Sequence, residues 1–293
     1  MKKTFKIDDK AIAFVFTAHR WGNRKTADKS KVETRMNKRM LNATKRLVDS
    51  IEYKRINSHI RETKHWVVMH SVPSFFQDGV FLFSTDMVET VEAYLASRRT
   101  ELNALIDEFV SVYPAQIEQA KELLDDQFFA NDYPTAEALR YRFGFNYQWI
   151  SFDVPKSLPD DLYAIEKKKV EALWAQAAEQ ITMSLRASFQ RLVTHVVERL
   201  TPEKGKKPKV IKDSVIDNIN EFIESFRSRN LTNDKELADL IEKAQSVLNN
   251  VDGDSLRDER FVKLAVRKGF SQIEKLLDGM VVEKPGRKFD FEE

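Results

Sequence analysis

Apolar side chains recur at alternating steps of three and four residues between positions 88 and 112. They are Val88, Val91, Leu95, Leu102, Leu105, Phe109 and Val112, and Arg98 stands where the spacing calls for a further apolar residue. This spacing predicts one long helix, roughly 40 Å at about 1.5 Å per residue. A helix of that length must be covered by another helix. The seam is therefore a candidate surface for a partner helix.

Helical signals continue through most of the chain. The 293 residues include only eight Gly and eight Pro, which argues against a loop-rich or all-β protein. We expect the first long helix to continue, straight or kinked, past Pro114 to about residue 128, and its antiparallel partner to be the second long helix, 160–200. The full set of predicted helical segments is 36–53, 88–128, 160–200, 212–229, 234–249 and 255–280, with Asn233 and Glu236 forming a capping box before the fifth.

Short runs rich in β-branched and aromatic residues predict strands. They are 11–18, 67–69 and 80–83, followed by one bent strand or a hairpin near Gly144 within 141–154. The predicted fold class is α+β, mostly α. We expect a small sheet at the base of a long antiparallel, coiled-coil-like helical arm, plus a C-terminal helical unit.

A segment rich in Pro, Gly and Lys at 201–208 is the clearest linker in the chain. It divides the expected domains into residues 1–200, with the basic segment, the sheet and the arm, and a three-helix unit over 209–280. The polar tail, 281–293, is either a docking peptide or a frayed end.

Charge is distributed very unevenly along the chain. The first 66 residues carry 18 Lys and Arg against 7 Asp and Glu, a formal charge of +11, whereas the remaining residues carry 30 against 39, a charge of −9. Such asymmetry indicates an anionic partner for the basic part. Its candidate binding residues are Arg20, Trp21, Arg24, Lys25, Lys29, Lys31, Arg35, Lys38, Arg39, Lys45 and Arg46.

Two interpretations of this basic segment have equal weight. The cations would neutralise nucleic-acid phosphates, with Trp21 as a stacking residue, or they would pair with the chain's own acidic part. A second aromatic and basic run, Arg140–Phe145, resembles a base-stacking platform, but its rings more simply supply core and its arginines meet surplus carboxylates.

No catalytic constellation is evident, and we expect a non-enzymatic protein without a cofactor. The chain has no Cys, no glycine-rich phosphate loop and no selective carboxylate pair. His19, His59, His65 and His70 cluster in the first quarter without a metal-ligand spacing, so no metal site is expected. The absence of a long apolar run predicts a cytoplasmic protein with no membrane partner.

Several short patterns together resemble a family of uncharacterised proteins of bacteriophages and integrative elements. They are Trp21–Lys25, Ala27–Lys29, Asn37–Arg39, Phe128–Pro134 with Arg142–Phe143, Val154–Pro155, Arg229–Thr232 and Leu256–Asp258. The resemblance spans most of the chain and implies a mobile-element setting near genes for MoxR-type AAA ATPases, von Willebrand A-domain proteins and recombination proteins. It implies no catalytic residues.

Two functional hypotheses follow. The first is a scaffold or adaptor whose apolar seams bind partner helices, either of its own copies or of an AAA ATPase assembly. The alternative is a nucleic-acid-binding accessory protein of phage replication, recombination or counter-defence that uses Arg20–Arg46.

Overall fold

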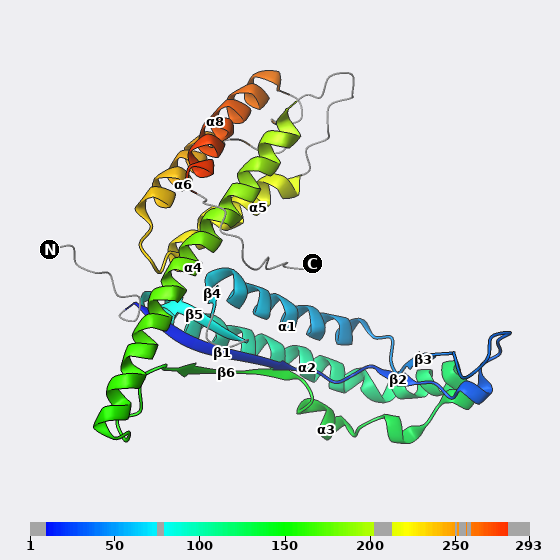
Figure 1. Ribbon diagram of the computed structural model, residues 1–293. Helices are drawn as coiled ribbons and strands as arrows, with labels where there is room; N and C mark the ends of the chain where they lie inside the picture. Colours follow the sequence, from blue (N-terminus) through cyan, green and yellow to red (C-terminus); the bar gives the residue numbers. More distant parts are fainter. Residues whose placement is uncertain are drawn as a thin grey trace. The chain divides into compact units, whose positions relative to one another are not determined.

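The computed structural model describes residues 10–74, 79–201, 213–249, 251, 256 and 259–280. It confirms the predicted class, an α+β protein that is mostly helical (Figure 1). Contacts between residues divide the chain into two compact units, residues 12–151 and residues 152–293 with 1–11. We call them the N-terminal unit and the C-terminal unit and describe each by itself.

The N-terminal unit combines a sheet, a two-stranded ribbon and two long helices. Its elements in chain order are β1 (Ala11–His19), β2 (Arg24–Thr26), η2 (Lys29–Lys31), β3 (Thr44–Arg46), α1 (Ile51–His70), β4 (Val72–Pro73), β5 (Val80–Ser84), η3 (Thr85–Met87), α2 (Val88–Leu124), η4 (Asp125–Gln127), η5 (Ala130–Asp132), α3 (Ala136–Arg140) and β6 (Gly144–Ile150). The order of strands in the sheet is β4-β5-β1-β6, and β2 pairs with β3 in a separate ribbon.

Strand β1 pairs antiparallel with β6, so that Phe16 lies opposite Tyr147 and Phe14 opposite Trp149. Because side chains alternate along a strand, these residues and Phe145 share one face of the sheet. Their rings pack together, with the Phe16 and Phe145 centroids 5.5 Å apart. Of the two alternatives predicted for residues 141–154, a bent strand or a hairpin, the structure has the single strand, which begins at Gly144.

The first residue of β6 lies close to a histidine ring of β1. A Cβ atom on Gly144 would lie 2.6 Å from Cε1 of His19, so the exposed imidazole would have to turn aside for a larger residue here.

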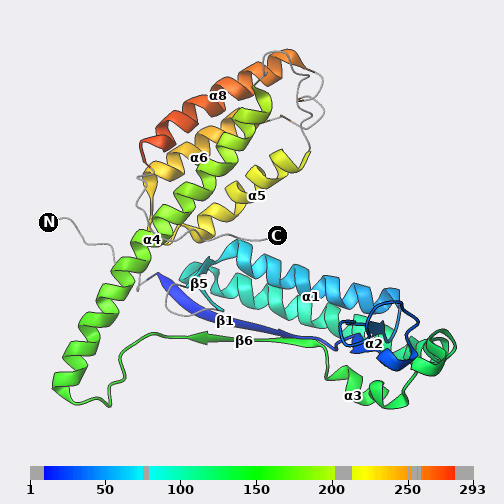
Figure 2. The ribbon, with the colours of Figure 1, turned by 45° about the vertical axis from the view of Figure 1, so that its right-hand side comes forward.

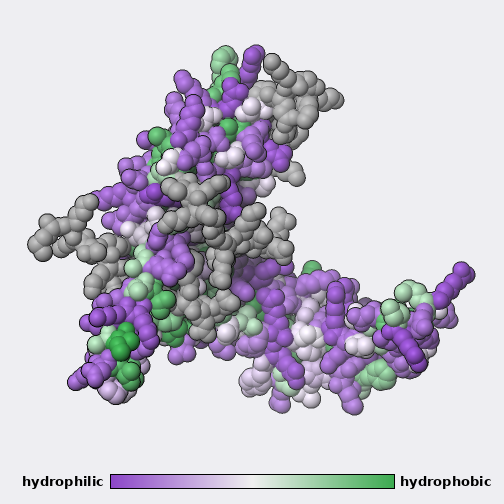
Figure 3. All heavy atoms as spheres, in the orientation of Figure 1, coloured by the Kyte–Doolittle hydropathy of each residue, from purple (hydrophilic) through white to green (hydrophobic). Residues whose placement is uncertain are grey.

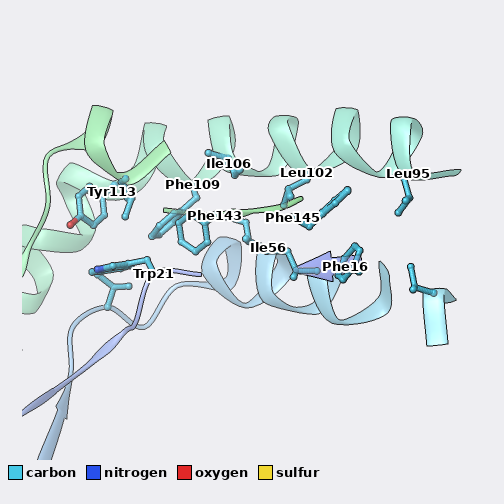
Figure 4. Packing of buried hydrophobic residues seen from close by; sticks show 14 of the residues in the cluster. Phe16, Trp21, Ile56, Leu95, Leu102, Ile106, Phe109, Tyr113, Phe143 and Phe145 are labelled. Atoms are coloured by element: carbon cyan, nitrogen blue, oxygen red, sulfur yellow. The ribbon is translucent and has the colours of Figure 1, made fainter. Parts of the chain in front are cut away.

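The helices α1 and α2 pack side by side over the sheet (Figure 1). Ile56 and Ile60 of α1 and Leu95, Leu102 and Phe109 of α2 are fully or almost fully buried. Figure 4 shows Ile56, Leu102 and Phe16 pointing toward one another from α1, α2 and the sheet. The core of the N-terminal unit is thus a layer of apolar side chains between a helix pair and one sheet face.

Two predictions in this region are wrong. Residues 67–69 are not a strand but the last turns of α1, where Val67 packs into the core. Residues 36–46 are not helical: they form an irregular segment and β3, and α1 begins only at Ile51 after the N-cap Ser50. Ser50 caps the helix because its hydroxyl accepts a hydrogen bond from the backbone N–H of Tyr53.

The C-terminal unit is a helical bundle. It consists of α4 (Asp160–Leu200), α5 (Asp213–Arg229), α6 (Lys235–Leu248) and α8 (Arg260–Asp278). Figures 1 and 2 both show the later half of α4 alongside the other three helices. The predicted bounds of α4 are confirmed, but its predicted pairing with α2 is wrong, because α4 packs on α5 and α8 while α2 packs on α1.

A partly buried ion pair connects α4 to the start of α6. Arg186 of α4 donates to both carboxylate oxygens of Asp234, at 2.6 and 2.9 Å, and also to Glu236. Asp234, not the predicted Asn233, is the N-cap residue of α6, and its side chain accepts the backbone N–H of Leu237. Asn233 instead adopts a φ of 54° in the turn before the cap.

The packing of α4 also bears on the division of the chain. Sequence patterns place the boundary at 201–208, whereas contacts divide the chain at Phe152, because α4 packs with the helices that follow it. Residues 202–208 and the tail 281–293 lie outside the described residues.

Candidate functional site

Residues 24–46, which we call the basic ribbon, form a two-stranded antiparallel ribbon and the segment that joins its strands. The ribbon places Arg24 opposite Arg46, Lys25 opposite Lys45 and Thr26 opposite Thr44. At its base, the Asn23 amide donates to the Val48 carbonyl at 2.6 Å and accepts the Val48 N–H at 2.8 Å. This short ribbon is therefore closed by a side chain that imitates a further pair of backbone hydrogen bonds.

The outer face of the basic ribbon carries two arginines and two threonines. Arg24, Thr26, Thr44 and Arg46 are all exposed, and alternation along the strands puts them on one side. Like charges directly opposite each other destabilise a strand pair. Asp49 relieves part of this repulsion by pairing with Arg46 at 3.1 Å, but the same carboxylate also binds Lys54 at 2.8 Å.

The inner side of the basic ribbon is fixed to the segment that follows α2. Lys45 is buried and pairs with Asp132 at 2.7 Å, and its ammonium lies 4.2 Å from the centroid of the Phe129 ring. The Gln127 side chain binds the backbone of Asp28 twice, accepting from its N–H and donating to its carbonyl. These contacts hold the inner side in place and leave the outer face uncovered.

A phenol adds to this anchor. The Tyr133 hydroxyl donates to the Leu47 carbonyl at 2.9 Å, directly after β3. Burial, and to a smaller degree the charge of Asp132, raise the pKa of Tyr133 to about 12, so this donor keeps its proton at neutral pH.

The predicted binding residues fall into three groups. Trp21 is core, and Lys31, Lys45 and Arg46 pair with Asp126, Asp132 and Asp49. Among the residues that the structure describes, no carboxylate lies within ion-pair distance of the other seven cations, which are Arg20, Arg24, Lys25, Lys29, Arg35, Lys38 and Arg39. Pairing within the chain therefore accounts for three of these ten cations, Lys31, Lys45 and Arg46.

The prediction that Trp21 is a stacking residue is wrong. Its side chain is 4% exposed and packs edge-on against Tyr53 and Tyr113, with ring centroids 6.0 and 5.9 Å away. In Figure 4 the indole lies below Tyr113 and Phe109, inside the core. Trp21 instead joins the start of the basic ribbon to α1 and α2.

The α2 seam is also not a free binding surface. Val91, Leu95, Leu102 and Phe109 are buried in the unit's own core, and Leu105 and Val112 pack against it. Arg98, the polar interruption, faces α1: it donates to the Thr63 hydroxyl and to the His59 carbonyl, each at 3.0 Å. The helix partner predicted for this seam is thus α1 of the same chain.

A second group of cationic side chains lies at the end of β1. A hollow there is lined by Phe16, Ala18, Arg20 and Lys64. In the view of Figure 3, hydrophilic residues dominate the surface around β2 and β3 as well, at the far end of the N-terminal unit. Positive charge without a described counter-charge therefore extends beyond the basic ribbon.

The Arg140–Phe145 run, His59 and His70 pack or pair within the N-terminal unit. Phe143 and Phe145 are buried and Arg140 pairs with Asp107, as expected for core. His59 is buried between α1 and α2, and His70 stacks on Trp66. Within the described part of the chain, no three His, Asp or Glu side chains gather in a way that could hold a metal ion.

Some residues of this site were not identified from the sequence. Asn23, Thr26, Thr44 and Asp132 shape or anchor the basic ribbon, yet only a knowledge of the strand register brings them together. The one available signal was the mirrored pair of tripeptides, Arg-Lys-Thr at 24–26 and Thr-Lys-Arg at 44–46.

Comparisons with protein-family models, with curated proteins and with solved structures found no match for this chain. None of the described helices is long and apolar enough to cross a membrane.

Proposed function

We propose that the N-terminal unit binds nucleic acid through the phosphate backbone, with the outer face of the basic ribbon as the contact surface. The observation that carries this proposal is the pairing of Arg24 opposite Arg46 on an exposed face, flanked by Thr26 and Thr44. The proposal assigns no reaction to the chain.

Electrostatics favours a polyanion as the ligand. The basic ribbon has nine Lys and Arg against Asp28 and Glu33. Opposed arginines repel each other in the unbound protein, and a phosphate between them would replace that repulsion with two attractions. Binding would also release counterions from the nucleic acid, which makes affinity strongly dependent on salt.

The donor chemistry of the face fits phosphate oxygens. A guanidinium offers a planar fork of N–H donors, and hydroxyls of Thr are frequent donors to the backbone of nucleic acids. Because Lys45, Gln127 and Tyr133 fix the inner side, the backbone positions that carry the outer donors are held in place before binding. Such preorganisation lowers the entropic cost of association.

The scaffold hypothesis has less support. Its expected surface, the α2 seam, is core within the N-terminal unit. A nucleic-acid-binding accessory role suits the mobile-element setting that the family resemblance implies, and we place this function ahead of an adaptor role for an AAA ATPase assembly.

The test is a salt titration of binding with a matched charge control. Fluorescence anisotropy of a labelled nucleic acid is measured from low to physiological salt for the wild type and for Arg24→Ala with Arg46→Ala. Each lost phosphate contact lowers the slope of log affinity against log salt by about 0.9, so this double variant should lose about 1.8. The control, Lys167→Ala with Lys168→Ala, removes two exposed cations of α4 and should leave the slope unchanged.

The fold is checked in the same samples. Thermal melting should show that the arginine double variant stays within about 0.5 kcal/mol of the wild type, because it removes both the Arg24–Arg46 repulsion and the exposed Arg46–Asp49 pair. No binding by the wild type at low salt, or equal slopes for both double variants, would overturn the proposal.

A further inference from the structure

We infer that the ligand is double-stranded DNA and that Met36 and Met40 insert into its minor groove. This inference rests on the proposed function and specifies its substrate. It starts from the tip of the basic ribbon, residues 34–40, whose sequence Thr-Arg-Met-Asn-Lys-Arg-Met repeats an Arg-Met pair after two residues.

The tip has a defined local structure. The Thr34 hydroxyl accepts the backbone N–H of Met36 at 3.1 Å, and the Asn37 side chain accepts the N–H of Arg39 at 3.0 Å. A backbone bond from Met40 to Asn37 closes the turn at 2.8 Å. These hydrogen bonds set the direction of both Arg-Met pairs.

Both methionines are exposed on this cationic tip. Met36 is 59% exposed and Met40 is 79% exposed, and each follows an exposed arginine. A thioether side chain is flexible and apolar, which suits contact with surfaces of variable shape. Methionine is also among the residues that minor-groove binders insert between base steps, while neighbouring cations hold the phosphates.

Single strands are a poorer fit to this surface. Proteins that bind them stack bases on exposed aromatic rings, and residues 24–46 contain no Phe, Tyr or Trp. The preceding aromatic residue, Trp21, is buried. Phe129 beside the ribbon is 44% exposed, but the ammonium groups of Lys45 and Lys31 lie over its ring.

Groove dimensions select DNA over RNA duplexes. The minor groove of B-form DNA receives apolar side chains that insert between base steps and kink the duplex. The minor groove of A-form RNA is wide and shallow instead. A cationic tip with two exposed apolar side chains therefore fits the minor groove of B-form DNA best.

The experiment uses the full chain and two labelled DNA duplexes. The first carries 2-aminopurine, whose fluorescence rises when a base is unstacked. The second carries a dye at each end, so that bending brings the dyes closer together. The wild type should bind duplex DNA more tightly than single-stranded DNA or duplex RNA, raise the 2-aminopurine signal and bring the dyes closer. Met36→Ala with Met40→Ala should lose both signals yet keep the salt slope of the wild type. Met183→Ala, at an exposed methionine of α4, is the matched control and should behave as wild type.

The outcomes separate this inference from the proposed function. Salt-dependent binding with no unstacking or bending, equal preference for single strands or RNA duplexes, or signals that persist in the double methionine variant would overturn the inference and leave the proposed function standing. Absence of salt-dependent binding to any nucleic acid would overturn both.

Discussion

Two groups of cations in the N-terminal unit differ in their partners. Between α1 and α2, Arg98 binds the His59 carbonyl, the Thr63 hydroxyl and the carboxylates of Glu62 and Glu101. On the outer face of the basic ribbon, Arg24 has no described carboxylate within ion-pair distance and faces another arginine. The difference shows how an arginine that specifies the fold can be told from one that is available to a ligand.

The largest change in stability is expected when the contacts of Arg98 are removed. Arg98→Ala removes several hydrogen bonds and the packing of a mostly buried side chain, and should lower the free energy of unfolding by about 1–3 kcal/mol. Chemical denaturation measures this change. Lys121→Ala, at an exposed cation of the same helix, should stay within about 0.5 kcal/mol of wild type. Equal effects of the two changes would contradict the distinction.

A smaller change, this time an increase in stability, is expected from a substitution in the basic ribbon. Arg24→Glu replaces a like-charge pair with an opposite-charge pair, and should raise the free energy of unfolding by roughly 0.2–1 kcal/mol. It should weaken nucleic-acid binding at the same time. Arg24→Lys keeps the charge and serves as the control for both measurements. A loss of stability in Arg24→Glu would mean that Arg24 has a structural partner.

The smallest effect is expected from pH. Burial lowers the pKa of His59, although its hydrogen bond to the Arg98 carbonyl and the charges of Glu101 and Glu62 oppose that shift. The unfolded chain therefore takes up a proton first, near its ordinary value of about 6.5, so stability should fall as pH decreases below that value. Above it, His59 is neutral in both states and contributes no pH dependence.

Melting temperatures between about pH 7.5 and about pH 5.5 measure this dependence, because the range lies above the ordinary pKa values of carboxylates. His59→Gln keeps a donor for the Arg98 carbonyl and should flatten the profile, whereas His195→Gln at an exposed histidine of α4 should not. A profile unchanged by His59→Gln would contradict the role given to burial.

The long helices were predictable because their periodicity extends over many turns. Strand β1 was predictable from its dense apolar run, and both α2 and α4 begin at the predicted residues. The run at 67–69 misled because a short apolar segment is typical of a strand and of a buried helix end alike. The packing partner of each helix was not predictable in this way. Periodicity shows that a helix has an apolar face to cover, but it does not show which element covers it.

The positive charge of the candidate site was predictable from the sequence, but its strand pairing and the burial of its residues were not. The excess of Lys and Arg over residues 20–46 is plain in the sequence, but strands of three polar residues leave no alternation of apolar positions to detect. The burial of Trp21 depends on Tyr53, Phe109 and Tyr113, which come from helices far along the chain. Only the fold separates the cations that anchor the ribbon from those that remain uncovered.

The pairing of β1 with β6 has a consequence for synthesis of the chain. Thr17 and its partner Asn146 are 129 residues apart, and Lys45 is 82 residues ahead of Gln127. At about 5–20 residues per second, a ribosome needs on the order of ten seconds to make the later partners. For that interval the edge of β1 that later pairs with β6 has no partner, and an unpaired strand edge can pair with another chain.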